Sequence, residues 1–339
     1  MMRAKANDVG ESTAVTSMTR ASQIVRAARR QLAVDTAFVP VVLIALIVGL
    51  SIASPYFFTG PNLQNLLIQA SVLGITAVGA TFLIISGELD LSIGSNVALS
   101  GVVATIGMTA MSKSVPLGVA LGVATGTAVG VVNGIVTCWL RVASFIATLG
   151  MLVIAAGLAL ELTNGATIAG VPPSFGLLAN TEFFGLRTLV WTMFAIFLVG
   201  YVLLRHSSFG IRTYAVGGNN EAARLAGLPV DRIRFLNFVI SGFTAGVGGV
   251  MLASRVQAGQ PYVGTLLTLY ATAAVILGGT SLMGGRGSMW RTFFGVLLIG
   301  VVQNGLDILG IDYALQQVAV GAVFILAASS EFVRRRSTG

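Results

Sequence analysis

Two carboxylates and two hydroxyls lie together in one short segment, Gly87-Glu-Leu-Asp-Leu-Ser-Ile-Gly-Ser95. Glu88 and Asp90 are two residues apart, so they diverge by about 200° on a helix but share one side of an extended chain. In an extended segment, they could bind the hydroxyls of a polar solute or gate its path. The alternative is structural, with Ser92 as the N-cap of the following helix and Asp90 near its positive end.

The sequence contains few residues of the types that serve in catalysis or metal binding. The chain has one cysteine, Cys138, and one histidine, His206, which excludes an internal disulfide and a zinc site with two or three histidines. A Ser-His-Asp site would depend on His206 alone, and we expect this residue to close a helix beside Arg205. We therefore predict no catalytic residue and no metal site.

The elements that carry these residues lie in lipid. Of 339 residues, 55% are hydrophobic and 9% are charged, whereas a soluble domain carries about 25% charged residues. The mean hydropathy of +0.90 indicates that the apolar excess extends along the chain, and the 42 glycines suit close packing of transmembrane helices. This composition excludes a water-soluble globule.

Apolar runs of about 20 residues predict an all-α polytopic membrane protein with about ten transmembrane helices. Residues 1–37 form an expected flexible cytoplasmic tail, residues 38–330 a membrane domain and residues 331–339 a basic cytoplasmic tail. The expected spans are 38–57, 64–86, 93–111, 116–139, 143–162, 187–204, 235–254, 264–282, 289–306 and 313–330.

The basic residues predict the orientation. With ten spans, all of the 20 Lys and Arg residues except Lys113, Arg187 and Arg255 fall on one side. Such an excess faces the cytoplasm, so we expect both termini inside and a long cytoplasmic loop at 205–234. The same rule explains the net charge of +8 without a nucleic-acid partner, since no basic stripe interleaved with aromatic residues occurs.

The 205–234 loop predicts a short helix of about seven residues. Asn219 or Asn220 can cap its start, and Glu221 in the first turn meets the positive end of the helix dipole. Gly227 can close the helix in a left-handed conformation, and Pro229 stops it. So short a helix is marginal alone in water, so we expect it either to dock onto a partner or to lie on the membrane surface.

This loop resembles the Glu-Ala-Ala loop of permease subunits of ATP-binding-cassette importers, and from Ala215 to Arg232 it is similar to their ribose, xylose and galactose branch. The resemblance implies a coupling helix that sits on a cytoplasmic ATPase. It assigns this coupling to Asn220, Glu221, Ala222, Ala223, Arg224 and Gly227.

Three further segments resemble the same branch, so that the similarity runs from about residue 40 to 330. They are the Asp90-Leu-Ser-Ile-Gly-Ser95 motif, the segment 141–150, in which Ala143 replaces the usual proline, and a second cytoplasmic loop, 278–288, with Gly285, Arg286 and Gly287. No strand precedes the glycines of this loop and no Gly-Lys-Ser/Thr occurs, so nucleotide binding is not expected there.

The resemblance implies the permease subunit of a monosaccharide or polyol importer in a prokaryotic plasma (inner) membrane. Implied partners are a cytoplasmic ATPase subunit that uses the ATP, an external sugar-binding protein, and a second permease copy or close homologue; no cofactor is expected on this chain. The expected path or gate residues are Glu88, Asp90, Ser92, Ser95, Asn96, Asn133, Phe145 and Asn304. Asn133 and Asn304 have an alternative role in hydrogen bonds between helices.

Two other functions remain open. An ion-coupled secondary transporter needs a protonatable group at mid-membrane, and Glu88 or Asp90 is the candidate for it. An intramembrane enzyme would need His206 as a base or a pair of aspartates, but Asp90, Asp307 and Asp312 lie near different span ends. The few charges within the spans favour a neutral solute.

Overall fold

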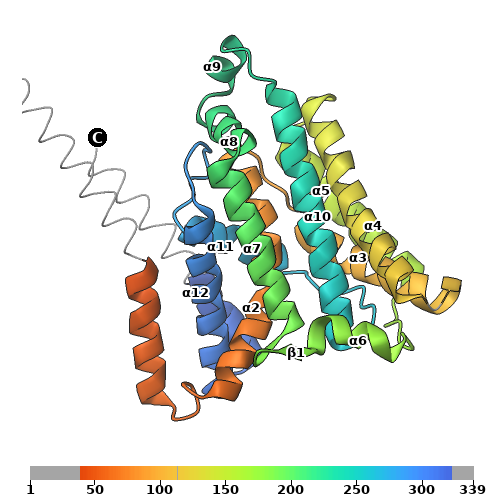
Figure 1. Cartoon of the computed structure of the whole chain (residues 1–339), viewed down its shortest axis with the longest axis vertical. Helices are drawn as coiled ribbons and strands as arrows, with labels where there is room; N and C mark the ends of the chain where they lie inside the picture. The colour runs from red at the N-terminus through yellow and green to blue at the C-terminus, as the bar shows by residue number, and fades with distance from the viewer. Residues whose placement is uncertain (1–38, 113, 323–339) are drawn as a thin grey trace, which may run out of the picture.

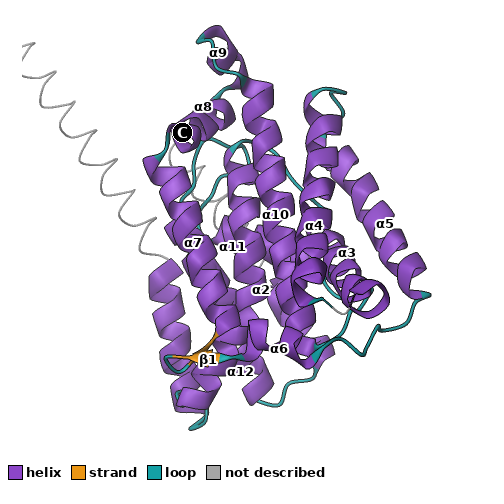
Figure 2. Ribbon diagram, turned by 45° about the vertical axis from the view of Figure 1, so that its right-hand side comes forward, coloured by secondary structure: helices purple, strands orange, loops and turns teal. Residues whose placement is uncertain are grey.

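The computed structural model describes residues 39–112 and 114–322 of the chain. The tails predicted at 1–37 and 331–339 lie outside these residues. The described chain is a bundle of helices with one antiparallel pair of two-residue strands, β1 (Glu182–Phe183) and β2 (Leu186–Arg187), drawn in orange in Figure 2. The all-α prediction is confirmed.

Seven helices of the described chain are long and apolar enough to cross a membrane. They are α2 (Gly60–Ile85), α3 (Ile93–Ile106, continued by the π-helix Gly107–Ser112), α4 (Val115–Cys138), α5 (Ser144–Thr163), α7 (Thr188–His206), α10 (Val230–Val256) and α12 (Met289–Ile308). Shorter helices lie between them: α6 (Pro173–Asn180), α8 (Ser208–Gly218), α9 (Asn220–Leu225) and α11 (Leu267–Leu277).

The ten expected spans correspond to these helices unevenly. The helix Val39–Ala53 and α11 fall within expected spans but are shorter than a full crossing. The span expected at 313–330 is helical from residue 313 to 322, where the described residues end. The described residues therefore contain seven helices of spanning length and composition, and the number ten and the position of the termini stay predictions.

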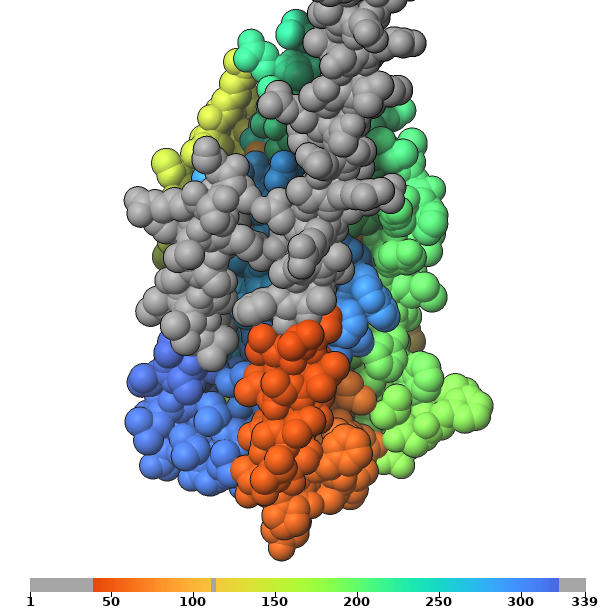
Figure 3. Space-filling view, turned by 90° about the vertical axis from the view of Figure 1, so that its left-hand side faces the viewer, coloured from red at the N-terminus to blue at the C-terminus, as the bar shows by residue number. Residues whose placement is uncertain are grey.

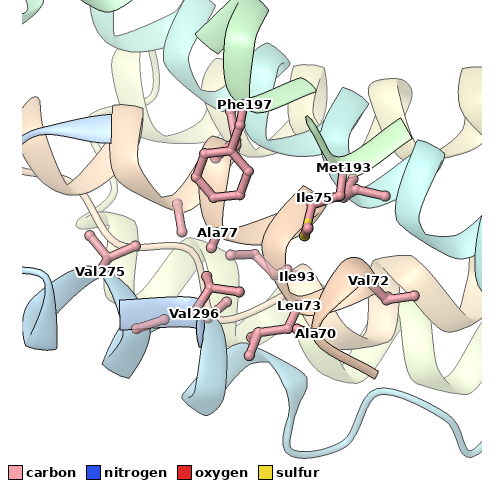
Figure 4. Packing of buried hydrophobic residues seen from close by; sticks show 14 of the residues in the cluster. Ala70, Val72, Leu73, Ile75, Ala77, Ile93, Met193, Phe197, Val275 and Val296 are labelled. Carbon is pink, nitrogen blue, oxygen red and sulfur yellow. The ribbon is translucent and has the colours of Figure 1, made fainter. Parts of the chain in front are cut away.

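Helix α2 is the centre of the bundle. Eighteen of its 26 residues are buried, as expected for a helix that is apolar on all sides. Figure 4 shows its side chains, among them Ile75, packed with Met193 and Phe197 of α7, Val275 of α11 and Val296 of α12. This packing fixes the end of α2 at Ile85, where the segment with Glu88 begins.

Helices α4 and α10 pack backbone to backbone. Glycine recurs at every fourth residue of α4, at 118, 122, 126, 130 and 134, so these glycines share one face of the helix. A side chain on Gly126 would overlap the Gly246 backbone, and one on Gly130 would overlap Gly242. The small-residue packing predicted from the glycine content is thus realised in an antiparallel helix pair.

The bundle has two ends, which we name the α9 end and the α6 end (Figure 1). The α9 end gathers α8, α9, the end of α2 and the start of α10, while α6 and the β1–β2 pair lie at the α6 end. The helix Val39–Ala53 forms a red to orange ridge on the outside of the molecule (Figure 3). Of the two cytoplasmic loops expected from the sequence, 205–234 contains α8 and α9 and so forms part of the α9 end. The other, 278–288, contacts α8 there.

Candidate functional site

The helical chain is interrupted between α2 and α3. Gly87 has a positive φ of 82°, which glycine adopts without the steric cost of a Cβ atom, and residues 88–90 belong to no helix or strand. Glu88 forms an ion pair with Arg234 of α10, and Asp90 Oδ2 accepts a hydrogen bond from Ser241 Oγ of the same helix at 2.9 Å. Both carboxylates therefore bind side chains of α10.

Asp90 and Ser92 form a buried turn that is tied to α4. Asp90 Oδ1 accepts hydrogen bonds from Ser92 N at 2.9 Å and from Ser92 Oγ at 2.6 Å. Asn133 Nδ2 of α4 donates to Ser92 Oγ at 2.9 Å. Because Asp90 and Asn133 use the Ser92 hydroxyl, Ser92 stands at the N-cap position of α3 without a side-chain cap bond. The structural alternative thus holds in position, with Ser92 as the N-cap residue of α3 and Asp90 beside the start of the helix, but the Ser92 hydroxyl makes no cap bond.

Hydroxyls from two further helices hold the backbone of this break. Thr268 Oγ1 of α11 accepts from Gly94 N at 2.8 Å and donates to Leu91 O at 3.2 Å. Thr148 Oγ1 of α5 donates mainly to Ser144 O in its own helix and lies 3.5 Å from Leu89 O. The Gly94 amide and the Leu91 carbonyl are thus satisfied by a side chain of the protein, as non-helical backbone in a membrane requires.

Of the remaining residues expected to line the path, Ser95 and Asn96 lie at the break, whereas Phe145 and Asn304 lie elsewhere. Asn96 Nδ2 donates to Gly126 O at 3.0 Å, and the partly buried Ser95 bonds to Ser92 O. Phe145 lies on the outside of α5 with 54% of its surface exposed. Asn304 exchanges two hydrogen bonds of 2.9 Å with Asn62. The structure gathers Glu88, Asp90, Ser92, Ser95, Asn96 and Asn133, while Phe145 and Asn304 lie apart from this set.

Helix α9 has the caps that the sequence predicted. Asn219, rather than Asn220, is the N-cap, and its Oδ1 accepts from Ala222 N at 2.9 Å. Gly227 has a φ of 78°, and Leu228 N returns to Ala223 O at 3.0 Å, which satisfies a carbonyl at the helix end. The helix itself is six residues long.

One face of α9 packs inward and the other is open. Ala223 is buried with Val216 of α8 and Ile233 of α10, whereas Glu221 and Leu225 are exposed, Leu225 by 85%. Arg224 is half exposed and forms a 2.6 Å ion pair with Asp231, a surface pair that a partner could exchange at little cost. The surface that α9 presents therefore consists of Glu221, Ala222, Arg224 and Leu225.

The two expected cytoplasmic loops meet the end of α2 at a glycine junction, formed by Gly87, Gly217, Gly218, Gly284 and Gly285. Gly285 N donates to Ile85 O at 2.8 Å, and a side chain on Gly217 of α8 would overlap the same carbonyl. The glycines allow three backbones to touch. Helix α8 is thereby in contact with the break through the 278–288 loop.

A tyrosine joins α8 to the 278–288 loop beside this junction. Tyr214 of α8 donates from its phenol to the carbonyl oxygen of Gly287 at 2.9 Å, and Arg286 O accepts from Ser281 N within the loop. Burial raises the pKa of the Tyr214 phenol, which moves its deprotonation further above neutral pH. In this loop Gly285 and Gly287 form backbone contacts rather than a phosphate cradle.

Sequence reasoning missed Arg234, Ser241, Tyr214 and Gly217. A signal for the first two was present, because Arg234, Asn237 and Ser241 recur at helical spacing in an apolar run. Nothing in the sequence paired them with Glu88 and Asp90. Within the part of the chain that is described, no three His, Cys, Asp or Glu residues come together as a metal site.

A bundle of apolar candidate spans, with a polar non-helical segment between α2 and α3, is the architecture of a multi-pass membrane protein. The family model described as "Branched-chain amino acid transport system / permease component" matches residues 62–328, and the chain belongs to this family. It is a permease component of the plasma (inner) membrane and not an enzyme.

The chain is similar to curated permeases over nearly all of their length. It is 39% identical to the "Ribose import permease protein RbsC" of Bacillus subtilis (strain 168), covering 84% of this chain and 89% of that protein. It is 39% identical to the "L-arabinose ABC transporter permease protein AraH" of Azospirillum brasilense, covering 87% and 86%. The predicted resemblance to this branch of ATP-binding-cassette permeases is confirmed, and the matches favour it over the ion-coupled alternative.

Among solved structures, the chain is similar to "PsaBC from Streptococcus pneumoniae in complex with Fab", at 20% identity and a TM-score of 0.44, over 85% of this chain and 94% of that one. This likeness is too distant to bear on function.

Proposed function

We propose that the chain is the permease subunit of an ATP-driven importer for a pentose or a similar monosaccharide. The observation that carries this proposal is the 39% identity to permeases named for ribose and L-arabinose over more than four fifths of each chain. An external binding protein delivers the sugar, and a separate cytoplasmic ATPase hydrolyses the ATP. A second copy of the chain, or a close homologue, completes the membrane unit.

The polar break between α2 and α3 supports a neutral solute. Glu88 is compensated by Arg234, and Asp90 is surrounded by the hydroxyls of Ser92 and Ser241. An ion path more often shows charged groups that face water or a bound ion within the membrane. We assign the gate of the sugar path to this break, with Glu88, Asp90, Ser92, Ser95, Asn96 and Asn133 as its residues.

The α9 end supports the coupling role. Glu221 and Leu225 are exposed on α9, and α8 leads from α9 to the glycine junction at the end of α2. Closure of the ATPase dimer would press on α9 and move the junction together with the break. Asn220, Glu221, Ala222, Ala223, Arg224 and Gly227 form or close this helix.

The first experiment is purification of the tagged chain from its native membrane in mild detergent. Mass spectrometry should find an ATPase in stoichiometric amount, and a co-purifying binding protein can be titrated with ribose, L-arabinose and leucine. Binding of a pentose supports the proposal. Recovery of the chain alone, also after crosslinking, or binding of leucine but of neither sugar, contradicts it.

Replacing Gly227 tests the coupling loop. A Gly227→Val variant should lower sugar uptake at least tenfold while ATP hydrolysis persists, because a β-branched residue is strained at the positive φ of 78°. Gly310→Val is the matched control, since Gly310 also has a positive φ and open space around it but lies far from α9 in the chain. Normal uptake by Gly227→Val would contradict the assignment of the loop.

A further inference from the structure

Two buried polar side chains beside the break have no hydrogen-bond partner among the described residues. Asn237 of α10 is fully buried, with both its amide nitrogen and its amide oxygen unpartnered, and Thr137 of α4 is 3% exposed with an unpartnered hydroxyl. Native proteins satisfy most buried polar groups, so an exception calls for an explanation. These two groups are not part of the network that holds Asp90 and Ser92.

Both groups stand one helical turn from a residue that does hold this network. Asn237 precedes Ser241, the partner of Asp90, by four residues on α10, and Thr137 follows Asn133, the partner of Ser92, by four residues on α4. Residues four apart share a helix face. Asn237 therefore lies on the same face of α10 as Ser241, and Thr137 on the same face of α4 as Asn133.

The step from Asn133 to Thr137 on α4 and the step from Ser241 to Asn237 on α10 lead in the same direction through the bundle. Helices α4 and α10 run antiparallel, since Gly134 lies against Phe235 and Phe238 whereas Gly126 lies against Gly246. Moving from Asn133 to Thr137 and from Ser241 to Asn237 thus leads, in both helices, toward the α9 end. The length of each displacement is about 6 Å, four residues at about 1.5 Å each.

We propose that Thr137 and Asn237 form a second docking position for the Asp90–Ser92 turn, one helical turn nearer the α9 end. In the first position, Ser241 donates to Asp90 and Asn133 donates to Ser92. In the second position, the Asn237 amide donates to Asp90 and the Thr137 hydroxyl donates to Ser92. Each position supplies one donor to Asp90 and one donor to Ser92, so the turn makes the same number of hydrogen bonds to α4 and α10 in both.

The ion pair at the end of α2 distinguishes the two positions. Glu88 contacts Arg234 in the first position, and a displacement of one turn carries Glu88 past Arg234 toward the surface. The glycine faces of α4 and α10 interlock, so these two helices move as one body, and the close contacts of α10 with α2, at Gly79, and with α3, at Val97, are released in this exchange. Asn237 and Thr137 are positioning residues for the gate, and this role rests on the proposed function.

The test compares uptake with stability in a Thr137→Val, Asn237→Leu double variant. Replacing unpartnered polar groups by apolar ones of similar shape does not destabilise the first position. The melting temperature of the purified protein should therefore stay the same or rise, while uptake by the complete transporter falls at least tenfold. Thr137→Ser, which keeps the hydroxyl, should retain uptake as a single variant.

Two outcomes would overturn the proposal. Unchanged uptake would mean that the groups hold only an internal water, and a fall of melting temperature together with uptake would mean a structural role. Thr127→Val is the matched control on α4, because the Thr127 hydroxyl bonds only to Val123 O of its own helix. This control should leave uptake unchanged.

A distance measurement separates failure of this proposal from failure of sugar import. In a Cys138→Ala background, spin labels are placed at the exposed positions Leu140, after α4, and Ile211, on α8. Pulsed electron paramagnetic resonance on the complete transporter, assembled with an excess of unlabelled chain so that only distances within one chain are measured, with and without ATP, should give two distances in the wild-type sequence and one in the double variant. A single distance throughout would overturn the second position, whether or not the protein imports a sugar.

Discussion

Glu88 and Arg234 form an ion pair at the point where α2 ends and α10 begins. Glu88 is 5% exposed and Arg234 is 20% exposed, so the pair is largely removed from water. Breaking such a pair on one side leaves a buried charge without compensation, which costs more than the pair itself contributes. The ion pair therefore fixes the geometry of the break more than it adds to overall stability.

This argument predicts the effect of Glu88→Gln. We expect the variant to lose about 3 kcal/mol of stability, the low end for a buried pair because Arg234 is partly exposed, seen as a lower melting temperature in detergent. A second substitution, Arg234→Met, should restore most of the loss, because it removes the unpaired charge. Asp231→Asn at the exposed pair with Arg224 is the control and should cost under about 1 kcal/mol. Equal losses at both pairs would contradict the burial argument.

At the scale of elements, the glycine junction links α8, the 278–288 loop and the end of α2. Gly217 and Gly218 are adjacent in α8, yet a side chain would overlap Ile85 O at Gly217 and meet nothing at Gly218. The close contact with Ile85 thus depends on Gly217 and not on Gly218. Because both residues are glycines in the same helix, the same substitution at each position isolates the effect of this contact.

We predict that Gly217→Ala lowers stability by about 1–3 kcal/mol through overpacking and reduces uptake, because α8 moves away from α2. Gly218→Ala should be neutral or slightly stabilising, since alanine favours a helix. Thermal unfolding and uptake measured on both variants test this. Similar behaviour of the two variants would show that the backbone contact at Ile85 does not matter.

At the scale of the whole molecule, the basic residues predict that the α9 end faces the cytoplasm. The structure supplies reporter positions, because Leu225 on α9 is 85% exposed and Phe184 at the α6 end is 82% exposed. A cysteine at either position is unique once the buried Cys138 is replaced by alanine.

In intact cells made permeable only at the outer membrane, an impermeant thiol reagent should label Phe184→Cys and not Leu225→Cys. Disruption of the inner membrane should expose Leu225→Cys to the same reagent. The reverse pattern would place the α9 end outside and contradict the coupling proposal as well.

The sequence alone determined what depends on neighbouring residues. Apolar runs specified membrane helices because lipid selects residues by hydropathy along the chain. The caps of α9 at Asn219 and Gly227 were predictable because each bond joins residues within five positions.

Only the tertiary structure decided the partners of the break. Ser241 lies 151 residues from Asp90. The sequence predicted Ser92 at the N-cap of α3, but only the folded structure shows that its hydroxyl binds Asp90 and Asn133 instead of the helix backbone. Phe145 and Asn304 were predicted with the path, but packing places one on the outer face and pairs the other with Asn62. Local hydrogen bonds and hydropathy act through adjacent residues, whereas these contacts depend on which helix faces meet in the folded bundle.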